Sequence, residues 1–262
     1  MLYETILVEN HDGIRTITLN RPTKLNSINY DVISELEHAV NSSQYNDEVR
    51  VVVLKGSGRA FCAGDDLKGM GTEKNPSPDD HIVNRVDIGY PRLIKSLREL
   101  RKPVIGFIHG YALGAGCDLA LSCDMIFATE ETKFGLVFAQ RGLVGGTILL
   151  PTLIGYQKAC ELLFSGNMFT AQEAKNMGIV NYVAPTYEEI ESMVNEWATR
   201  FSKSPTTALG LMKQSINQGI GASLERSIDI QKHMTVGVYH TKDSSEGKQA
   251  FVEKREANFI GK

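Results

Sequence analysis

Two glycine-rich segments carry the residue types that best suggest chemistry. They are GSGRAFCAGDDLKGM, residues 56–70, and HGYALGAGCDLALSCD, residues 109–124. Each follows an apolar, strand-like run and is expected to lead into a helix, where small residues expose main-chain N–H groups. Two such donors could converge on one oxygen, as stabilisation of a thioester or ester oxyanion requires. The alternative is that the glycines only permit tight turns.

An acid stands inside the apolar part of the second segment. Asp118 lies two positions after Gly116 and is followed by Leu119, Ala120 and Leu121. A carboxyl group in apolar surroundings has a raised pKa, which suits proton transfer near neutral pH. The other interpretation is an interaction of Asp118 with the early N–H groups of its helix or with a nearby cation.

Other functional motifs are weak or missing. The stretch GSGRAF begins like a dinucleotide fingerprint, but Phe61 replaces its third glycine. No P-loop, G-x-S-x-G elbow or H-E-x-x-H motif occurs, and the six histidines are dispersed. The four cysteines form no C-x-x-C pair, which predicts reduced thiols. We therefore expect no metal and no separate cofactor.

The composition is that of an ordinary globular protein. The chain has 262 residues, of which 42% are hydrophobic and 23% charged, with a formal net charge of −3. This balance disfavours nucleic acid as a partner. The N-terminus does not resemble a secretory signal, and the apolar runs are too short to cross a bilayer. A cytoplasmic protein without a membrane partner is expected.

The surrounding pattern predicts an α/β core followed by helices. A β-hairpin is expected near the start, then a helix from Asp31 to Val40 capped by Asp31, and a buried strand in VRVVVLKG. A loop at 64–80, a helix at 81–101 and a strand in KPVIGFIHG repeat this rhythm. We expect a core at 1–200 and a helical region at 201–262. The longer helical patterns lie at 186–203, 205–219, 222–237 and 241–257.

Seven segments, in this order, resemble the crotonase (enoyl-CoA hydratase/isomerase) superfamily. They are LNRPTKLNSIN, GRAFCAGDDLKGM, HGYALGAGCDLALSCDMIFA, KFGL, GGTILLPTLIG, AQEAKNMGIV and EGKQAFVEKREANF. The resemblance implies a spiral of repeated ββα units and a helical C-terminal trimerisation region. It also implies a homotrimer or a hexamer of two trimers, and an acyl-CoA thioester as substrate, with coenzyme A entering only as part of that substrate.

The resemblance also implies roles for single residues. The N–H groups of Ala63 and Ala115 would be the oxyanion donors, and Asp118 would be the acid/base at the position of one of two family glutamates. Residues 60–67 would border the adenine end, and lysines would approach the CoA phosphates. Asp65 and Asp66 would cap a short helix after Gly64, or one would contact the ribose. The full substrate-binding set is Lys24, Ala60, Phe61, Ala63, Asp65, Asp66, Leu67, Lys68, Gly114, Phe138 and Lys254, the last serving its own subunit or a neighbour.

This sequence departs from the family at the second glutamate. Counting from Asp118 places that position at Phe138, and the following loop, QRGLVGGTILLP, is about three residues shorter than in many relatives. A two-carboxylate hydration mechanism is therefore weakened. The hypothesis is hydration, dehydration or isomerisation through a thioester enolate with Asp118 as acid/base. The alternatives are thioester hydrolysis or C–C cleavage on the same fold, and a non-catalytic acyl-CoA-binding protein.

Overall fold

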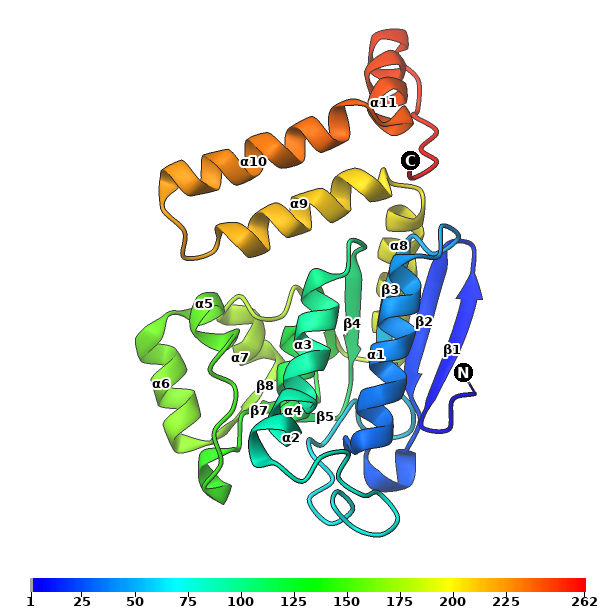
Figure 1. Cartoon of the computed structure of the whole chain (residues 1–262). Helices are drawn as coiled ribbons and strands as arrows, with labels where there is room; N and C mark the ends of the chain where they lie inside the picture. Colours follow the sequence, from blue (N-terminus) through cyan, green and yellow to red (C-terminus); the bar gives the residue numbers. More distant parts are fainter. Residues whose placement is uncertain (1) are drawn as a thin grey trace.

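The computed structural model describes residues 2–262, and a six-stranded sheet forms its centre. The strand order is β1-β2-β3-β4-β6-β9, and all neighbours are parallel except the β1–β2 hairpin (Figure 1). Parallel neighbours require crossover connections, which here run through helices and the second sheet. The strands are β1 Ile6–His11, β2 Ile14–Leu19, β3 Val51–Gly56, β4 Val104–Ile108, β6 Met125–Thr129 and β9 Tyr182–Ala184.

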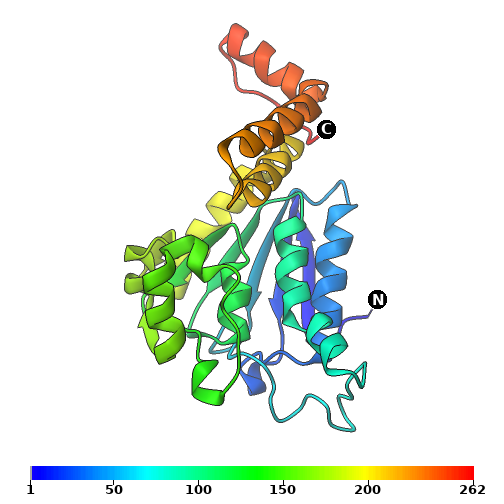
Figure 2. The ribbon, with the colours of Figure 1, turned by 60° about the vertical axis from the view of Figure 1, so that its left-hand side comes forward.

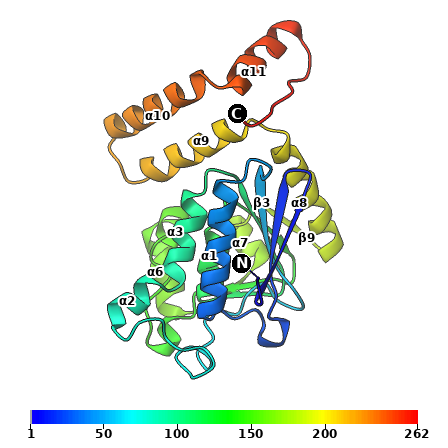
Figure 3. The same cartoon turned by 45° about the vertical axis from the view of Figure 1, so that its right-hand side comes forward.

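Helices cover both faces of this sheet. Alternate residues of β3 explain why, because Val52 and Leu54 point into one core and Val51 and Val53 into another. Helices α1 (Tyr30–Gln44) and α3 (Tyr90–Glu99) pack on the first face, and α8 (Tyr187–Ser202) packs on the second (Figure 3).

A second, small sheet supports the segment around Asp118. Its order is β5-β7-β8, with β5 parallel to β7 and β7 antiparallel to β8. Helix α4 begins immediately after β5, so the small sheet fixes the start of α4. The elements here are β5 Tyr111–Leu113, α4 Ala115–Leu121, β7 Lys133–Gly135, α5 Leu150–Ile154, α6 Tyr156–Ser165, β8 Met168–Thr170 and α7 Ala171–Asn176.

Three helices follow α8 and stand away from the sheets. Helices α9 (Thr206–Gly219) and α10 (Leu224–Tyr239) form an antiparallel pair, and α11 (Lys242–Glu253) lies at its outer end (Figure 2). This arrangement confirms the predicted α/β core with a helical C-terminal region.

Three local predictions are wrong. The helix at 81–101 is split into α2 (Ile82–Asp87) and α3, because Gly89 is extended and Pro91 opens the new helix. Asn29, not Asp31, caps α1, since its side chain accepts from the Val32 amide at 3.0 Å. No helix follows Gly64; residues 67–70 form a turn.

A buried lysine ties α9 to the core. The Lys213 Nζ donates to Asp124 Oδ2 and to the Leu97 carbonyl, both at 2.7 Å. Asp124 Oδ2 also accepts from the Val104 amide at 2.8 Å, at the start of β4. Burial lowers the pKa of Lys213 and raises that of Asp124, and the attraction between them opposes both effects.

We expect Lys213→Met to destabilise the chain by about 3 kcal/mol, because it leaves the Asp124 charge buried without its partner. Adding Asp124→Asn should recover part of this loss, since the amide oxygen still accepts from Val104. Urea unfolding of the full chain measures both effects. A double variant no more stable than Lys213→Met would contradict this account.

Candidate active site

The two glycine-rich segments run side by side. The Cys62 amide donates to the Tyr111 carbonyl at 2.9 Å, and the Leu113 amide donates to the Cys62 carbonyl at 3.0 Å. Gly64 has φ +98°, and a Cβ built on it would lie 2.8 Å from the Leu113 carbonyl oxygen. A Cβ on Gly116 would collide with the Cys62 carbonyl. The two segments approach this closely only because glycine stands at both positions.

This contact decides which main-chain N–H groups are free. The Ala63 amide donates to the Leu25 carbonyl at 3.0 Å, so the prediction of Ala63 as an oxyanion donor is corrected. Within residues 2–262, the amides of Asp65 and Ala115 donate to no protein acceptor. A Cβ on Gly64 would be 3.7 Å from the Ala115 nitrogen, so the two segments are in contact here. Asp65 is the next residue after Gly64, and its amide therefore lies near this contact.

Asp118 lies one turn into α4 and is only 1% exposed. Its Oδ2 accepts a hydrogen bond from the Gly146 amide at 2.9 Å, while its Oδ1 is buried without a partner in the part of the chain that the structure describes. Burial raises the pKa of Asp118 to about 7, the Gly146 hydrogen bond opposes this, and the charge of Asp65 adds to it. Asp118 therefore takes up or releases a proton near neutral pH.

Aromatic rings enclose the space around Asp118. Tyr90, at the start of α3, stacks on Phe138 with ring centroids 6.1 Å apart. The Phe138 ring lies against Gly145, whose added Cβ would be 2.5 Å from the end of the ring. Burial raises the pKa of the Tyr90 hydroxyl, as do the charges of Asp118 and Asp65. Burial also raises the pKa of Asp65, to about 6.

Several predicted binding residues lie together in a neighbouring pocket of about 690 Å³. Lys24 and Lys68 are exposed on its wall together with Lys74. Asp66 also lines it, but its carboxylate is paired with Arg21 at 2.9 Å and accepts from the Gly69 amide. Asp66 therefore stabilises the turn rather than offering a free group to a ligand.

Other predicted residues lie outside this cluster. The Ala60 and Phe61 side chains are fully buried in the protein, while Leu67 is exposed. Gly114 precedes α4 and forms its N-cap. Lys254 ends α11, at the far end of the molecule from the glycine-rich segments of the same chain (Figure 1).

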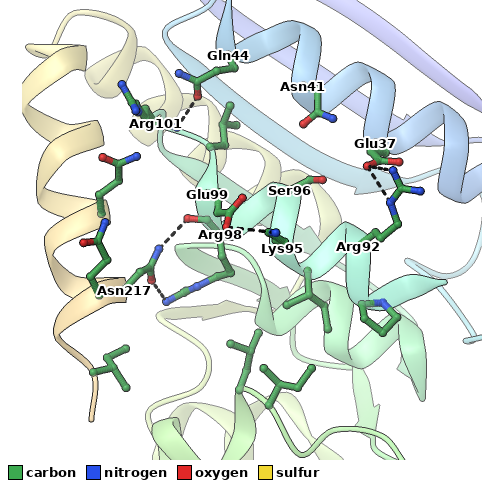
Figure 4. Close-up of a pocket in the computed structure, with 18 of the residues that line it drawn as sticks. Glu37, Asn41, Gln44, Arg92, Lys95, Ser96, Arg98, Glu99, Arg101 and Asn217 are labelled. Carbon is green, nitrogen blue, oxygen red and sulfur yellow. Dashed lines mark hydrogen bonds and ion pairs between the residues drawn. The ribbon is translucent and has the colours of Figure 1, made fainter. Parts of the chain in front are cut away.

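A different cavity, of about 1440 Å³, contains none of these residues. It lies between α1, α3 and α9, and its charged side chains largely satisfy one another (Figure 4). Arg92 pairs with Glu37 at 2.9 Å, and Arg98 hydrogen-bonds Asn217. The volume of this cavity alone does not indicate a catalytic or binding function.

The sequence did not show the contacts of three residues that shape the site, of which Tyr90 was expected only as pocket wall or core. Tyr90 and Gly146 come from segments distant from Asp118, and only the fold brings them to it. Arg21 stood in the quoted LNRP stretch, but nothing in its spacing indicated Asp66 as its partner. In residues 2–262 no group of acids, cysteines and histidines is arranged to hold a metal, and no helix has the length and apolarity to cross a membrane.

The two sheets and the helical C-terminal region define a class of α/β proteins, here with a buried acid in the helix that follows β5. The enoyl-CoA hydratase/isomerase family model matches residues 9–262, and the chain belongs to this family. It is 35% identical to the 1,2-epoxyphenylacetyl-CoA isomerase of Escherichia coli and 33% identical to the crotonyl-CoA hydratase of Syntrophomonas wolfei, with full coverage of each chain. An enoyl-CoA hydratase structure from Bacillus anthracis superposes with a TM-score of 0.89, at 34% identity over 99% of this chain and 100% of the other.

The raised pKa of Asp118 predicts a pH-dependent gain in stability for Asp118→Asn. The unfolded carboxyl titrates near ~3.9, so the folded protein binds this proton more tightly. The native state is then favoured at low pH and loses stability as the pH rises from about 4 through 7. Asparagine does not ionise. Asp118→Asn should therefore be more stable than the wild type at pH 8, by a margin on the order of 2 kcal/mol larger than at pH 5.

Urea midpoints at the two pH values measure this difference. Asp80→Asn, at an exposed acid whose side chain makes no hydrogen bond within residues 2–262, is the matched control. An equal gain for Asp118→Asn at both pH values would show that its folded-state pKa is ordinary.

Proposed function

We propose that this family member catalyses proton transfer on an acyl-CoA thioester, through an enolate held by the Asp65 and Ala115 amides. The single observation that supports this most is the buried Asp118, with a free Oδ1 near neutral pKa, one helical turn from the free Ala115 amide. A thioester oxygen between the two amides would place the neighbouring carbons beside this carboxyl group. Preorganised N–H donors of this kind stabilise charge that develops in the transition state.

The reaction that fits best is movement of a double bond. Asp118 as carboxylate removes a proton from the γ carbon of a 2-enoyl thioester, and the electrons move to the thioester oxygen. A proton then adds at the α carbon, which gives the 3-enoyl isomer with no net change in atoms. Hydration needs a second group to hold water, and Phe138 offers none at the position where a carboxyl was expected. The matching family model is that of enoyl-CoA hydratases and isomerases, which makes both reactions relevant, and the aromatic wall favours isomerisation.

The pocket beside the site suits the CoA phosphates. Lys24 and Lys68 line it, and Asp66, bonded to Arg21, connects its wall to Asp65 in the site. The ammonium group of an exposed lysine binds phosphate as a point charge. In this proposal Lys24 and Lys68 contact the CoA phosphates, and Asp66, which is paired with Arg21, does not bind the ligand.

The C-terminal helices fit a trimer interface. Their exposed apolar side chains have no cover within the described chain. A homotrimer, alone or paired into a hexamer, would bury them and would allow Lys254 to reach a neighbouring subunit's ligand. The most exposed of these side chains are Met212, Ile216, Leu224, Val236, Phe251 and Val252.

Asp118→Asn tests the function directly. We expect turnover of 2-enoyl- and 3-enoyl-CoA esters to fall by about 10²–10⁴, the usual contribution of a general acid/base, while CoA-ester binding is retained. Loss of conjugated-enoyl absorbance without a change in mass reports isomerisation, the same loss with a mass gain of one water reports hydration, and free thiol reports hydrolysis. Unchanged turnover in Asp118→Asn removes this residue from the mechanism. Binding without turnover of any ester by the wild type would instead indicate a non-catalytic protein.

Lys24→Ala with Lys68→Ala tests the phosphate contacts. We expect the KM for acyl-CoA to rise about tenfold with little change in kcat, because these charges bind the nucleotide equally in ground and transition states. The same esters on a pantetheine carrier, which lacks these phosphates, should be processed equally by the variant and the wild type. A larger KM for the pantetheine ester in the variant would indicate a disturbed site rather than a lost phosphate contact.

A further inference from the structure

The carboxyl group of Asp65 is a second acid inside the same site. Asp65 forms a bridge with Ile28, so the chain is extended here, and successive side chains point in opposite directions. Asp66 points toward Arg21 and the Gly69 amide. Asp65 therefore points the other way, and its carboxyl accepts no hydrogen bond from any of residues 2–262.

The electrostatics agree with this direction. The charge of Asp65 acts on Asp118 of α4, on the hydroxyl of Tyr90 and on the buried thiol of Cys62. The Arg21 cation is nearby but is bonded to Asp66. Asp65 thus lies near the Asp118 carboxyl, the Tyr90 hydroxyl and the Cys62 thiol in a half-buried space, with no cation of its own among the described residues.

We propose that Asp65 is the second acid/base of the reaction, replacing from the first glycine-rich segment the carboxyl that is missing at Phe138. This inference rests on the proposed function, which assigns Asp118 but no second acid/base. Asp118 has a short side chain held at Oδ2 by Gly146, so its free Oδ1 serves one end of the reacting unit.

Asp65 is placed to serve the other end. Its own amide is one of the two free donors, so the thioester oxygen would bind at the Asp65 main chain. The α carbon is two bonds from that oxygen and therefore lies close to the Asp65 side chain. From the 3-enoyl ester, Asp65 as carboxylate removes the α proton, and Asp118, which has the higher pKa of the two, delivers its proton as carboxylic acid to the γ carbon. The 2-enoyl ester reacts by the reverse of these steps: Asp118 as carboxylate removes the γ proton, and Asp65, in the less populated one-proton form of the pair, delivers its proton to the α carbon. The substrate loses one proton and gains one, and the pair still holds a single proton, now on the other acid.

This mechanism needs the pair to carry one proton. Two interacting carboxyls titrate as a unit, and their pKa values of about 6 and about 7 bound the pH range of that state. The wild-type kcat/KM should therefore rise with pH near the first value and fall near the second. A mechanism with Asp118 alone as base would rise through about 7 and stay high.

The experiment compares wild type, Asp65→Asn and Asp118→Asn on one 2-enoyl-CoA ester across pH 5 to 9, with the exposed-acid variant Asp80→Asn as control. We expect Asp65→Asn to lower kcat about 100-fold with KM within about threefold, the usual size of a general-acid effect. The kcat/KM of this variant should no longer fall at high pH. Its rise with pH should move below pH 7, because the Asp65 charge that raised the pKa of Asp118 is gone. Asp65→Glu should recover part of kcat and the fall at high pH.

Several results overturn the proposal. Full kcat with an unchanged profile in Asp65→Asn excludes a proton-transfer role, and a raised KM at unchanged kcat assigns Asp65 to binding alone. Binding of acetyl-CoA with wild-type affinity by Asp65→Asn shows that the variant is folded, so a lost kcat then supports the proposal. Full activity of Asp118→Asn contradicts the proposed function, whatever Asp65→Asn does, and so separates the two failures.

Discussion

The contact between the segment at Cys62–Asp65 and the segment at Leu113–Gly116 is the constraint on which the site depends. Two hydrogen bonds join Cys62 to β5, and Gly64 and Gly116 let the two backbones meet without side chains between them. The contact sets where α4 begins, and α4 places Asp118. It also leaves the amides of Asp65 and Ala115 without acceptors among the described residues, although each belongs to a different crossover of the fold. One packing arrangement therefore positions both the free amides and the acid.

Burying acids without a cation is costly, and the surrounding groups explain how the fold accepts it. A carboxylate sealed from water normally pairs with a cation or becomes protonated. Lys213 performs the first function for Asp124, far from the site, and Arg21 does so for Asp66. Asp118 has only the Gly146 amide, and Asp65 has no such partner among the described residues. The chain thus pairs its structural acids and leaves its site acids able to change charge near neutral pH.

The sequence predicted the fold class, the helical C-terminal region and the apolar surroundings of Asp118, because apolar periodicity and glycine spacing are local signals. It failed where an outcome depends on which partner a group finds. In the sequence, Ala63 and Asp65 are equally plausible sources of a free main-chain N–H group in the same loop. Only the hydrogen bond from the Ala63 amide to the Leu25 carbonyl shows that the Ala63 amide is not free. Likewise, the sequence does not distinguish the adjacent residues Asp65 and Asp66, whereas in the structure Asp66 pairs with Arg21 and Asp65 does not. The split of the 81–101 helix, by contrast, was readable from Gly89 and Pro91.

The packing of Phe138 on Gly145 has an evolutionary consequence. Because the ring occupies the space where a Cβ at position 145 would stand, the two positions cannot change independently. A single substitution of Phe138 by an acid would leave a void beside Gly145 and remove the ring that stacks on Tyr90. Residues at the two positions should therefore change together in evolution, which couples the wall of the site to the segment whose Gly146 amide holds Asp118.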